Sequence, residues 1–442
     1  MVFQHECQGG GIAYTDESFF KVRLFDLVSA LARSLDMVSQ TLAGHHTNVG
    51  FLTSSIAGCY GLSDAEYRNI VLAAMLHDIG AVSLYPAVDS LLFEDDTIKH
   101  SIAGSVIISS SKKLQDIPKL VEHHHTPWEE LRELDSYYQL SNIINLADFI
   151  DVNTRRDRPV QDQIPDLISL CKKHKGTMFN PDYIEALREA ESKPHFYPNL
   201  RAAHAQTTLN ISSQFDEDVL DADGVLDFTG LFATVIDFRS RFTATHSQGV
   251  AVTSCVLGRW LGFNDVQQVL FQIAGRLHDI GKLAVPAALL EKNGRLTSEE
   301  FAIIQRHATY TEHILSDIPG LEIIRDWACQ HHERLDGTGY PHGLSGDDIS
   351  LGSRILQVAD VFTAITEDRP YRKGMDFAQA TKVLRQLGDS QKLDPVVVEV
   401  LIERYDEINE LRCKGQMQAL EHFSNYSEVL YSKYGIVVKD VS

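Results

Sequence analysis

His278-Asp279-Ile280-Gly281-Lys282 is the stretch around which the chain is organised. It follows an apolar run typical of a buried helix, and Gly281 can close such a helix. An adjacent imidazole and carboxylate at a buried helix end suit a borderline divalent metal, and a carboxylate can bridge two metals. The alternative is a hydrogen-bonded His-Asp pair that only stabilises a core. Further potential ligands elsewhere in the chain distinguish a metal site from such a structural pair.

The chain repeats its histidines and aspartates at a nearly constant offset. The matched positions are His45 with His246, His77-Asp78 with His278-Asp279, His100 with His307, His124-His125 with His331-His332, and Asp148 with Asp360. The offset is 201 residues for the first two matches, 207 for the next two and 212 for the last. Ten of the 19 histidines fall on these positions, which chance would not produce. Small steps in the offset are typical of loop insertions in a duplicated domain.

The apolar periodicity predicts an all-α protein with two tandem helical bundles. Apolar residues recur at helical spacing in both halves, and no stretch shows sustained strand alternation. A chain of 442 residues is also too long for one ordinary core. The predicted division is a loose arm at 1–20, a first bundle at 21–194, a linker at 195–222 and a second bundle at 223–442.

Composition excludes several classes of protein. A formal net charge of -21 argues against nucleic acid or an anionic membrane as the main partner, since both favour a basic face. Six scattered cysteines without a C-x-x-C pair indicate reduced thiols in the cytosol. No leader peptide and no apolar run of membrane-spanning length is apparent. We therefore expect a soluble cytoplasmic protein with no membrane partner.

Seven side chains in the second half form the candidate metal site: His246, His278, Asp279, His307, His331, His332 and Asp360. His246 shares a helix face with Val250, Thr253 and Leu257, so we expect it to point into the bundle. The helix of His307 opens with the capping box Thr297-x-x-Glu300. Buried structural histidines would each need a polar partner, whereas a dinuclear metal centre satisfies the whole set together.

At this point the second half resembles the HD-GYP family. The resemblance lies in HDIGK, in residues 331–341 (HHERLDGTGYP), in Val358-Ala359-Asp360 and in Arg369-Pro370-Tyr371-Arg372, and it covers residues 226–410. Members of this family are bacterial metal-dependent phosphodiesterases of cyclic dinucleotides. The resemblance implies cleavage of cyclic di-GMP, or of 3′3′-cyclic GMP-AMP, to the linear dinucleotide by a hydroxide that bridges two metals.

The family also implies a role for each matched residue. One metal would be held by His246, His278, Asp279 and Asp360, and the other by Asp279, His307, His331 and His332. Lys282 would place an ammonium at the scissile phosphate or near the leaving O3′, so Lys282 and Asp279 are the catalytic candidates. Arg369 and Arg372 resemble a clamp for the second phosphate, with a solvated loop as the alternative. Members with three metals carry a Glu where Phe242 stands, so we expect two metals, with Fe or Mn ahead of Zn, Ni or Mg.

The first half is a degraded copy of this site. It retains the ligand set His45, His77, Asp78, His100, His124, His125 and Asp148. However, Ala81 stands at the lysine position, Asp157 stands at the first clamp position, and the loop after His125 has no Gly-Tyr-Pro. Catalysis is therefore not expected there. The first half is either a pseudo-enzyme domain that supports folding or dimerisation, or a regulatory site for a metal or ligand.

Three functions remain open at this stage. The leading one is a cyclic-dinucleotide phosphodiesterase with its site in 226–410. The second is another HD-type phosphohydrolase, such as a nucleotidase, which would have no need for Arg369 and Arg372. The third is a metal- or nucleotide-binding regulator that does not turn over. We expect a homodimer, and the Gly-Tyr-Pro turn either shapes the pocket mouth or meets a signalling protein.

Overall fold

The computed structural model describes residues 20–38, 43–84, 97–201, 211, 213–239, 245–292, 294–368 and 373–437. In this part of the chain the regular structure is almost entirely helix, which confirms the predicted all-α class. The strands described are β1 (Val22–Arg23) and β2 (Val219–Leu220), of two residues each. The predicted arm at 1–20 lies almost entirely outside the described residues.

The first half begins with β1 and continues through short and medium helices. Its elements are α1 (Leu24–Asp36), α2 (His45–Tyr60), α3 (Asp64–Leu76), α4 (Ala81–Leu84), α5 (Thr97–Ile108), η4 (Lys112–Leu114), α6 (Pro118–Glu122), α7 (Trp128–Leu131), α8 (Ser136–Gln139), α9 (Ser141–Asn153), η5 (Val160–Asp162), α10 (Ile164–Lys173), α11 (Pro181–Glu191) and α12 (Phe196–Arg201). Local chemistry fixes several starts: Ser63 and Glu66 form a capping box at α3, and Asn180 caps α11 ahead of a proline in its first turn.

The second half follows the same plan and ends in a long helix. Its elements are η6 (Ser213–Phe215), β2, α14 (Ala222–Arg239), α15 (His246–Trp260), α16 (Asp265–Leu277), η7 (Ile280–Ala284), α17 (Ala287–Leu290), α18 (Ser298–Ser316), α19 (Glu322–Cys329), η8 (Gly346–Asp348), α20 (Leu351–Thr366), α21 (Phe377–Asp389), α22 (Pro395–Glu403) and α23 (Tyr405–Tyr434). The predicted capping box of Thr297 and Glu300 is confirmed at α18. Asn264 with Gln267, and Asp376 with Gln379, cap α16 and α21 in the same way.

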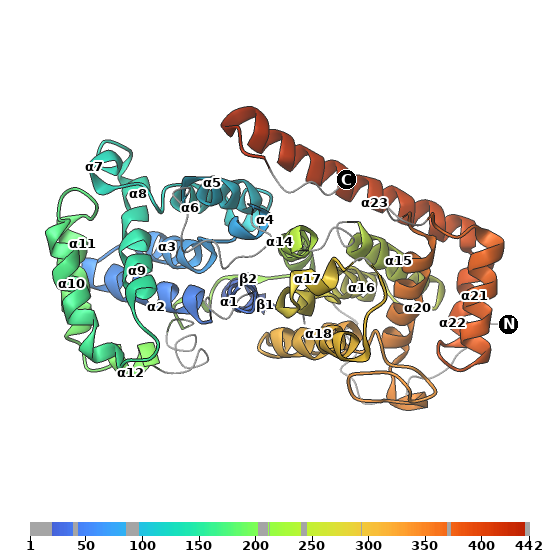
Figure 1. The fold of residues 1–442 in the computed structure, drawn as a ribbon. Helices are drawn as coiled ribbons and strands as arrows, with labels where there is room; N and C mark the ends of the chain where they lie inside the picture. Colours follow the sequence, from blue (N-terminus) through green and yellow to red (C-terminus); the bar gives the residue numbers. More distant parts are fainter. Residues whose placement is uncertain are drawn as a thin grey trace.

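The two halves pack against each other through equivalent elements. β1 and β2 precede the first long helix of each half, and they pair antiparallel, with Val22 opposite Leu220. α1 contacts η7 and α18 of the second half, while α14 contacts α4 and α5 of the first. Figure 1 shows these elements at the centre of the molecule, between the two bundles. Buried apolar residues of both halves form one connected core, so the halves are not independent units joined by a flexible tether.

The segment predicted as a linker, 195–222, is partly structured. α12 lies within it and packs Phe196 against Phe51 of α2, with ring centroids 5.8 Å apart. The predicted domain boundaries themselves remain a prediction. α23 runs across the top of Figure 1, from α15 of the second half to α5 of the first. Among the described residues, no helix combines the length and the apolar character that crossing a bilayer requires.

Candidate metal centre

The end of α16 places two predicted ligands at the centre of the second half. His278 caps α16 and Asp279 follows it, and each is 1% exposed. His278 Nδ1 donates to Gly275 O at 2.8 Å, which leaves Nε2 as the ligand atom, 3.2 Å from Asp279 Oδ2. The prediction that Gly281 closes this helix is wrong. Gly281 lies on η7, where an added Cβ would come within 2.0 Å of His307 O, so the glycine permits close packing of η7 on α18.

Three further histidines gather on the other side of Asp279. His307 of α18 donates its Nδ1–H to Ile304 O at 2.7 Å, and His331, just past α19, donates to Ala328 O at 2.6 Å. Their Nε2 atoms lie 3.6 and 4.0 Å from Asp279 Oδ1. His332 completes this group, because ligand atoms of the three histidines all lie within 4.8 Å of one another.

His246 and Asp360 complete the set from α15 and α20. His246 Nε2 lies 3.0 Å from Asp360 Oδ1, and both residues lie with His278 in a second group whose ligand atoms are within 4.8 Å of one another. The helix face predicted for His246 is buried, as Val250, Thr253 and Leu257 all are. The second ring nitrogen of His246, Nδ1, lies 3.3 Å from Glu367 Oε2. The structure therefore brings all seven predicted side chains together.

This donor set fits a pair of divalent cations. Asp279 lies between the two groups, with Oδ2 toward His278 and Oδ1 toward His307 and His331. Asp279 Oδ1 is buried and has no hydrogen-bond partner among the described residues. A buried carboxylate oxygen without a partner is costly, and a cation that also meets the imidazole lone pairs would satisfy it. Imidazole and carboxylate donors suit Fe, Mn and Zn.

Burial and neighbouring charges tune the imidazoles unequally. Burial lowers the pKa of His307 to about 4 and that of His332 to about 3. Burial opposes charge on His246 as well, but hydrogen bonds to Asp360 and Glu367 raise its pKa to about 9. Burial alone would raise the pKa of Asp279, yet the neighbouring His278 and Lys282 hold it well below its usual range. At pH 7 His307 and His332 are thus neutral ligands, whereas His246 must release a proton to bind a cation.

Lys282 lies at the edge of this centre. Its Nζ is 2.6 Å from Asp279 Oδ2, and its side chain is 22% exposed. The ammonium therefore contacts the carboxylate that lies between the two groups while remaining open to solvent. Ala81, at the matched position of the first half, is buried and carries no charge.

The Gly-Tyr-Pro loop packs against the His332 side of the centre. Glu333 is 1% exposed and its carboxylate accepts the backbone N–H groups of residues 342–344 at 2.7, 3.2 and 2.9 Å. Gly339 is needed beside it, because an added Cβ would lie 2.5 Å from Glu333 Cα. The ring of Tyr340 lies with its centroid 4.8 Å from that of His332. Glu333 thus holds the loop so that Tyr340 covers a candidate ligand.

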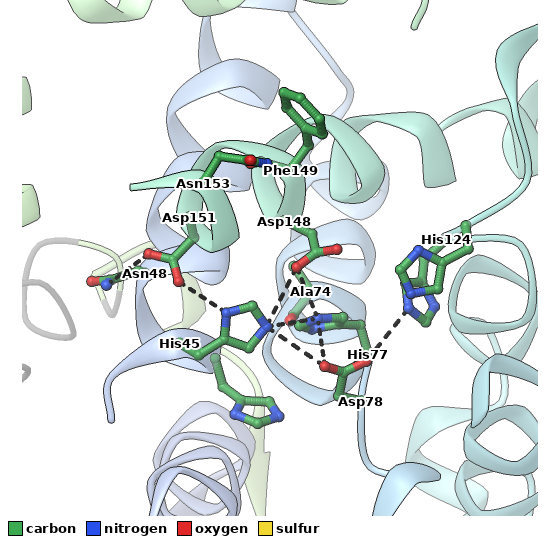
Figure 2. A network of polar contacts seen from close by, with 12 residues as sticks. His45, Asn48, Ala74, His77, Asp78, His124, Asp148, Phe149, Asp151 and Asn153 are labelled. Atoms are coloured by element: carbon green, nitrogen blue, oxygen red, sulfur yellow. Dashed lines mark hydrogen bonds and ion pairs between the residues drawn. The ribbon is translucent and has the colours of Figure 1, made fainter. Parts of the chain in front are cut away.

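The first half builds a similar centre, shown in Figure 2. His45 Nε2 lies 3.2 Å from His77 Nε2, and Asp148 Oδ1 lies 3.4 Å from His45 Nε2. Asp78 Oδ2 lies 3.3 Å from His77, so it joins this group as Asp279 joins its own. As in the second half, the other ring nitrogen of the first histidine faces a carboxylate: His45 Nδ1 lies 2.9 Å from Asp151 Oδ2.

A second group forms on the other side of Asp78. His100 Nε2 lies 3.1 Å from Asp78 Oδ1, and His124 and His125 stand beside it with ligand atoms within 4.8 Å of one another. Asp78 Oδ1 faces His100 and His124, as Asp279 Oδ1 faces His307 and His331. The first half therefore also brings all its predicted ligands together.

The surroundings of the first-half centre differ from those of the second. Arg156 pairs with Asp151 at 2.6 Å, and Arg155 pairs with Asp157 at 2.8 Å. Two of the basic residues that follow α9 are thus paired with carboxylates, one in α9 and one in the turn after it. Ala81 also leaves this centre without a counterpart of Lys282.

Some predicted residues cannot be placed, and some functional candidates were not predicted. Arg369, Arg372 and Phe242 lie outside the described residues. Glu333 stood in the quoted motif, but nothing in the sequence indicated that it holds the loop. Asp151 and Glu367 were not singled out because they do not occupy matched positions: they lie three residues after Asp148 and seven after Asp360.

Comparisons with known proteins agree with this architecture. Models of the HD domain match residues 231–397 and 42–153. A 3′3′-cGAMP-specific phosphodiesterase 1 of Vibrio cholerae is 30% identical over 408 residues, which cover 89% of this chain and 94% of the relative. A cyclic di-GMP phosphodiesterase of Pseudomonas aeruginosa is 39% identical over 163 residues, 37% of this chain and 39% of that protein.

A solved structure shows the same fold. The crystal structure of a cyclic GMP-AMP-specific phosphodiesterase of Vibrio cholerae, V-cGAP3, aligns with a TM-score of 0.62 at 22% identity, over 87% of this chain and 98% of that one. The fold, the two HD domains and the relative that aligns over nearly its full length all indicate the same family. The chain belongs to the HD-GYP family of cyclic-dinucleotide phosphodiesterases, with two HD domains in tandem.

Proposed function

We propose that the second half hydrolyses a 3′,5′-linked cyclic dinucleotide, 3′3′-cyclic GMP-AMP or cyclic di-GMP, to the linear dinucleotide, and so ends a second-messenger signal. The observation that carries the proposal is the position of Asp279, whose two oxygens face two separate groups of buried histidines. Such a carboxylate suits two cations close enough to act on one phosphodiester.

Each residue then has a defined task. His246, His278, Asp279 and Asp360 would hold one cation, and Asp279, His307, His331 and His332 the other. Fe or Mn is the first choice, with Zn, Ni or Mg as alternatives, and two ions are proposed instead of three. When bound, the cations supply Lewis-acid charge and an activated water. They also offset the protein's negative charge, which would otherwise repel the substrate.

The chain's own cations would complete the substrate site. Lys282 sits beside Asp279, from where its ammonium can neutralise charge on the scissile phosphate as the P–O bond breaks. Arg369 and Arg372 are proposed to clamp the second phosphate, since guanidinium groups bind phosphate oxygens in pairs. Tyr340 lies beside His332, from where it would contact the substrate. A nucleotidase would use one phosphate group only and would have no need of the clamp.

Of the two candidate substrates, 3′3′-cyclic GMP-AMP is the one to test first. The relative that aligns over 94% of its length and 89% of this chain is named for 3′3′-cGAMP. The cyclic di-GMP phosphodiesterase of Pseudomonas aeruginosa aligns over only 37% of this chain. A second relative named for 3′3′-cGAMP, phosphodiesterase 3 of Vibrio cholerae, is 33% identical over 62% of this chain and 58% of its own length.

The first half is proposed not to turn over substrate. Its ligand set is complete, but Ala81 replaces the lysine and Arg156 is engaged by Asp151. It serves either as a supporting domain or as a site regulated by metal or ligand. A homodimer, a signalling partner at the Gly-Tyr-Pro loop and a cytoplasmic location, without membrane or nucleic-acid partners, complete the proposal.

The test is release of linear dinucleotide by the full-length chain loaded with Mn or Fe. Each cyclic dinucleotide is incubated with the protein, and products are separated by chromatography. The double variant His278→Ala, Asp279→Ala should abolish product, and the matched variant His77→Ala, Asp78→Ala should retain it. A fully metal-loaded wild-type protein that leaves both cyclic dinucleotides intact would refute the proposal. If only the first-half variant lost activity, the active site would lie in the first half, and the proposal would be wrong.

A further inference from the structure

Seven of the ten candidate ligand histidines orient their rings in one of two ways. His77, His124, His278, His307 and His331 each donate Nδ1–H to a backbone carbonyl three residues earlier, at 2.6 to 2.8 Å. Such a carbonyl is available because each of these histidines lies on a helix or just past its end. The hydrogen bond fixes the tautomer and leaves Nε2 free to bind a cation.

His246 is the first residue of α15, and among the described residues no main-chain carbonyl is hydrogen-bonded to its Nδ1. Its Nδ1 instead faces Glu367 Oε2 at 3.3 Å, from the residue that follows α20. Glu367 is 6% exposed, so the contact is sheltered from solvent. The carboxylate thus takes the place of the carbonyl that those five histidines use.

The first half reaches the same arrangement by a different position. His45 is the first residue of α2, and its Nδ1 faces Asp151. Asp151 lies three residues after Asp148, one helical turn on, whereas Glu367 lies seven residues after Asp360, two turns on. Residues that are not equivalent in the repeat therefore meet the same need. In each half, the ligand histidine that begins a helix faces a carboxylate, whereas the five histidines above bond to main-chain carbonyls.

The support of Glu367 comes from the last helix. Gln416 of α23 donates Nε2–H to Glu367 Oε2 at 3.3 Å, and Arg412, one turn earlier, donates to Gln416 Oε1. Gly249, one turn after His246, makes room for the amide: a Cβ there would lie 2.9 Å from Gln416 Nε2. α23 thus packs close to α15 at the point where it reaches the carboxylate.

We propose that Glu367 positions His246 for metal binding, and that Gln416 holds Glu367 in place from α23. Glu367 is a positioning residue because it acts through the imidazole and touches neither substrate nor cation. The inference rests on the metal centre of the proposed function. It adds that one of the two cations depends on a carboxylate and a helix outside the ligand set.

The test measures metal affinity in the full-length chain, by competition of Mn²⁺ with a chromophoric chelator. Removing an outer partner of a metal-binding histidine typically weakens metal binding about 10- to 100-fold. We expect Glu367→Gln to weaken one metal equivalent by that factor and leave the others unchanged. Glu367→Asp should restore part of the affinity, and Gln416→Met should weaken it in the same direction by a smaller factor. Gln418→Met, an exposed neighbour on the same helix, is the control.

Activity gives an independent reading. Glu367→Gln should need about 10- to 100-fold more metal for half-maximal hydrolysis, with kcat recovering as metal saturates. Wild-type affinity for every equivalent in Glu367→Gln would overturn the inference, as would a lower melting temperature without a change in metal binding. If Glu367→Gln does not fold, Gln416→Met decides. A wild-type protein that binds metal but cleaves no cyclic dinucleotide would refute the proposed function, and the chelator titration would still settle this point.

Discussion

The hydroxyl of Tyr426, near the end of the last helix, lies 3.2 Å from Ser83 Oγ in the opposite half of the chain. It also lies 3.3 Å from Ala103 O of α5. Ser83 belongs to α4, just after the turn that carries Asp78, and α5 carries His100. One end of α23 therefore contacts the elements that build the first-half centre, while its Gln416 supports the second-half centre. The helix α23 therefore contacts both halves and stabilises their packing against each other.

Replacing Tyr426 by Phe should weaken the contact between α23 and the first half. The variant keeps the packing against Phe238 but loses the hydrogen bond, so we expect the free energy of unfolding to fall by about 1 kcal/mol. Urea denaturation followed by circular dichroism measures the change. Tyr431→Phe is the matched control, since Tyr431 on the same helix is 67% exposed. Equal midpoints for Tyr426→Phe and wild type would show that the hydroxyl contributes nothing.

The two HD turns should tolerate no side chain at their glycine. A Cβ at Gly281 would lie 2.0 Å from His307 O, and one at Gly80 would lie 2.1 Å from His100 O. Because both obstacles are backbone atoms, we expect Gly281→Ala and Gly80→Ala each to cost about 1–3 kcal/mol or more. Gly281→Ala should also weaken metal binding in the second half, because it displaces His307. Gly230→Ala is the control, since nothing lies within 4 Å of a Cβ there. A Gly281→Ala protein as stable as that control would contradict the close packing.

The sequence predicted the ligands of both centres because each ligand occurs twice, at matched positions. It did not predict Asp151 and Glu367, which break the match while meeting the same need. The sequence also suggested that Gly281 closes a helix, whereas the glycine allows η7 to pack closely on His307. This contact joins segments far apart in the sequence. The pairing of β1 with β2 and the reach of Tyr426 to Ser83 are likewise long-range contacts. No local pattern encodes them, whereas the capping box of Thr297 and Glu300 is local and was predicted correctly.

Glu333 should govern the shape of the Gly-Tyr-Pro loop. Its carboxylate accepts three backbone N–H groups of residues 342–344, and hydrogen bonds to a charged group contribute about 1.5–3 kcal/mol each. Glu333→Gln removes the charge and one acceptor, so the loop should become susceptible to protease. KM for the cyclic dinucleotide should rise as Tyr340 loses its fixed place beside His332. The exposed Asp336→Asn serves for comparison. Unchanged proteolysis and KM in Glu333→Gln would rule out this role.

Lys282 should matter for turnover far more than for metal binding. Its ammonium contacts Asp279 at 2.6 Å but offers no lone pair to a cation. We expect Lys282→Met to lower kcat about 100-fold or more, since a lost charge-stabilising donor typically costs that much. Metal content per chain should stay at the wild-type value. The experiment compares steady-state kinetics with metal analysis of the same preparation. Wild-type kcat in Lys282→Met would remove the lysine from the catalytic residues.

Metal binding at His246 should depend on pH in a way that binding at His307 and His332 does not. Metal-free His246 has a pKa of about 9, so it carries a proton at pH 7.5 that the cation must displace. Affinity there should therefore rise about tenfold per pH unit up to pH 9. His307 and His332, with pKa values of about 4 and 3, are already neutral and should show no such slope above pH 5.

Calorimetry in two buffers of different ionisation enthalpy counts the protons released on metal binding. The pKa of His45 in the first half is also raised well above its ordinary value: burial opposes the charged form, but the bonds to Asp151 and Asp78 outweigh it. His45→Gln and His246→Gln therefore separate the two contributions. We expect His246→Gln to remove about one proton from the count at pH 7.5, together with the pH slope of that equivalent. A slope that survives in His246→Gln would mean that another ligand carries the displaced proton, and the assignment of the first cation to His246 would have to change.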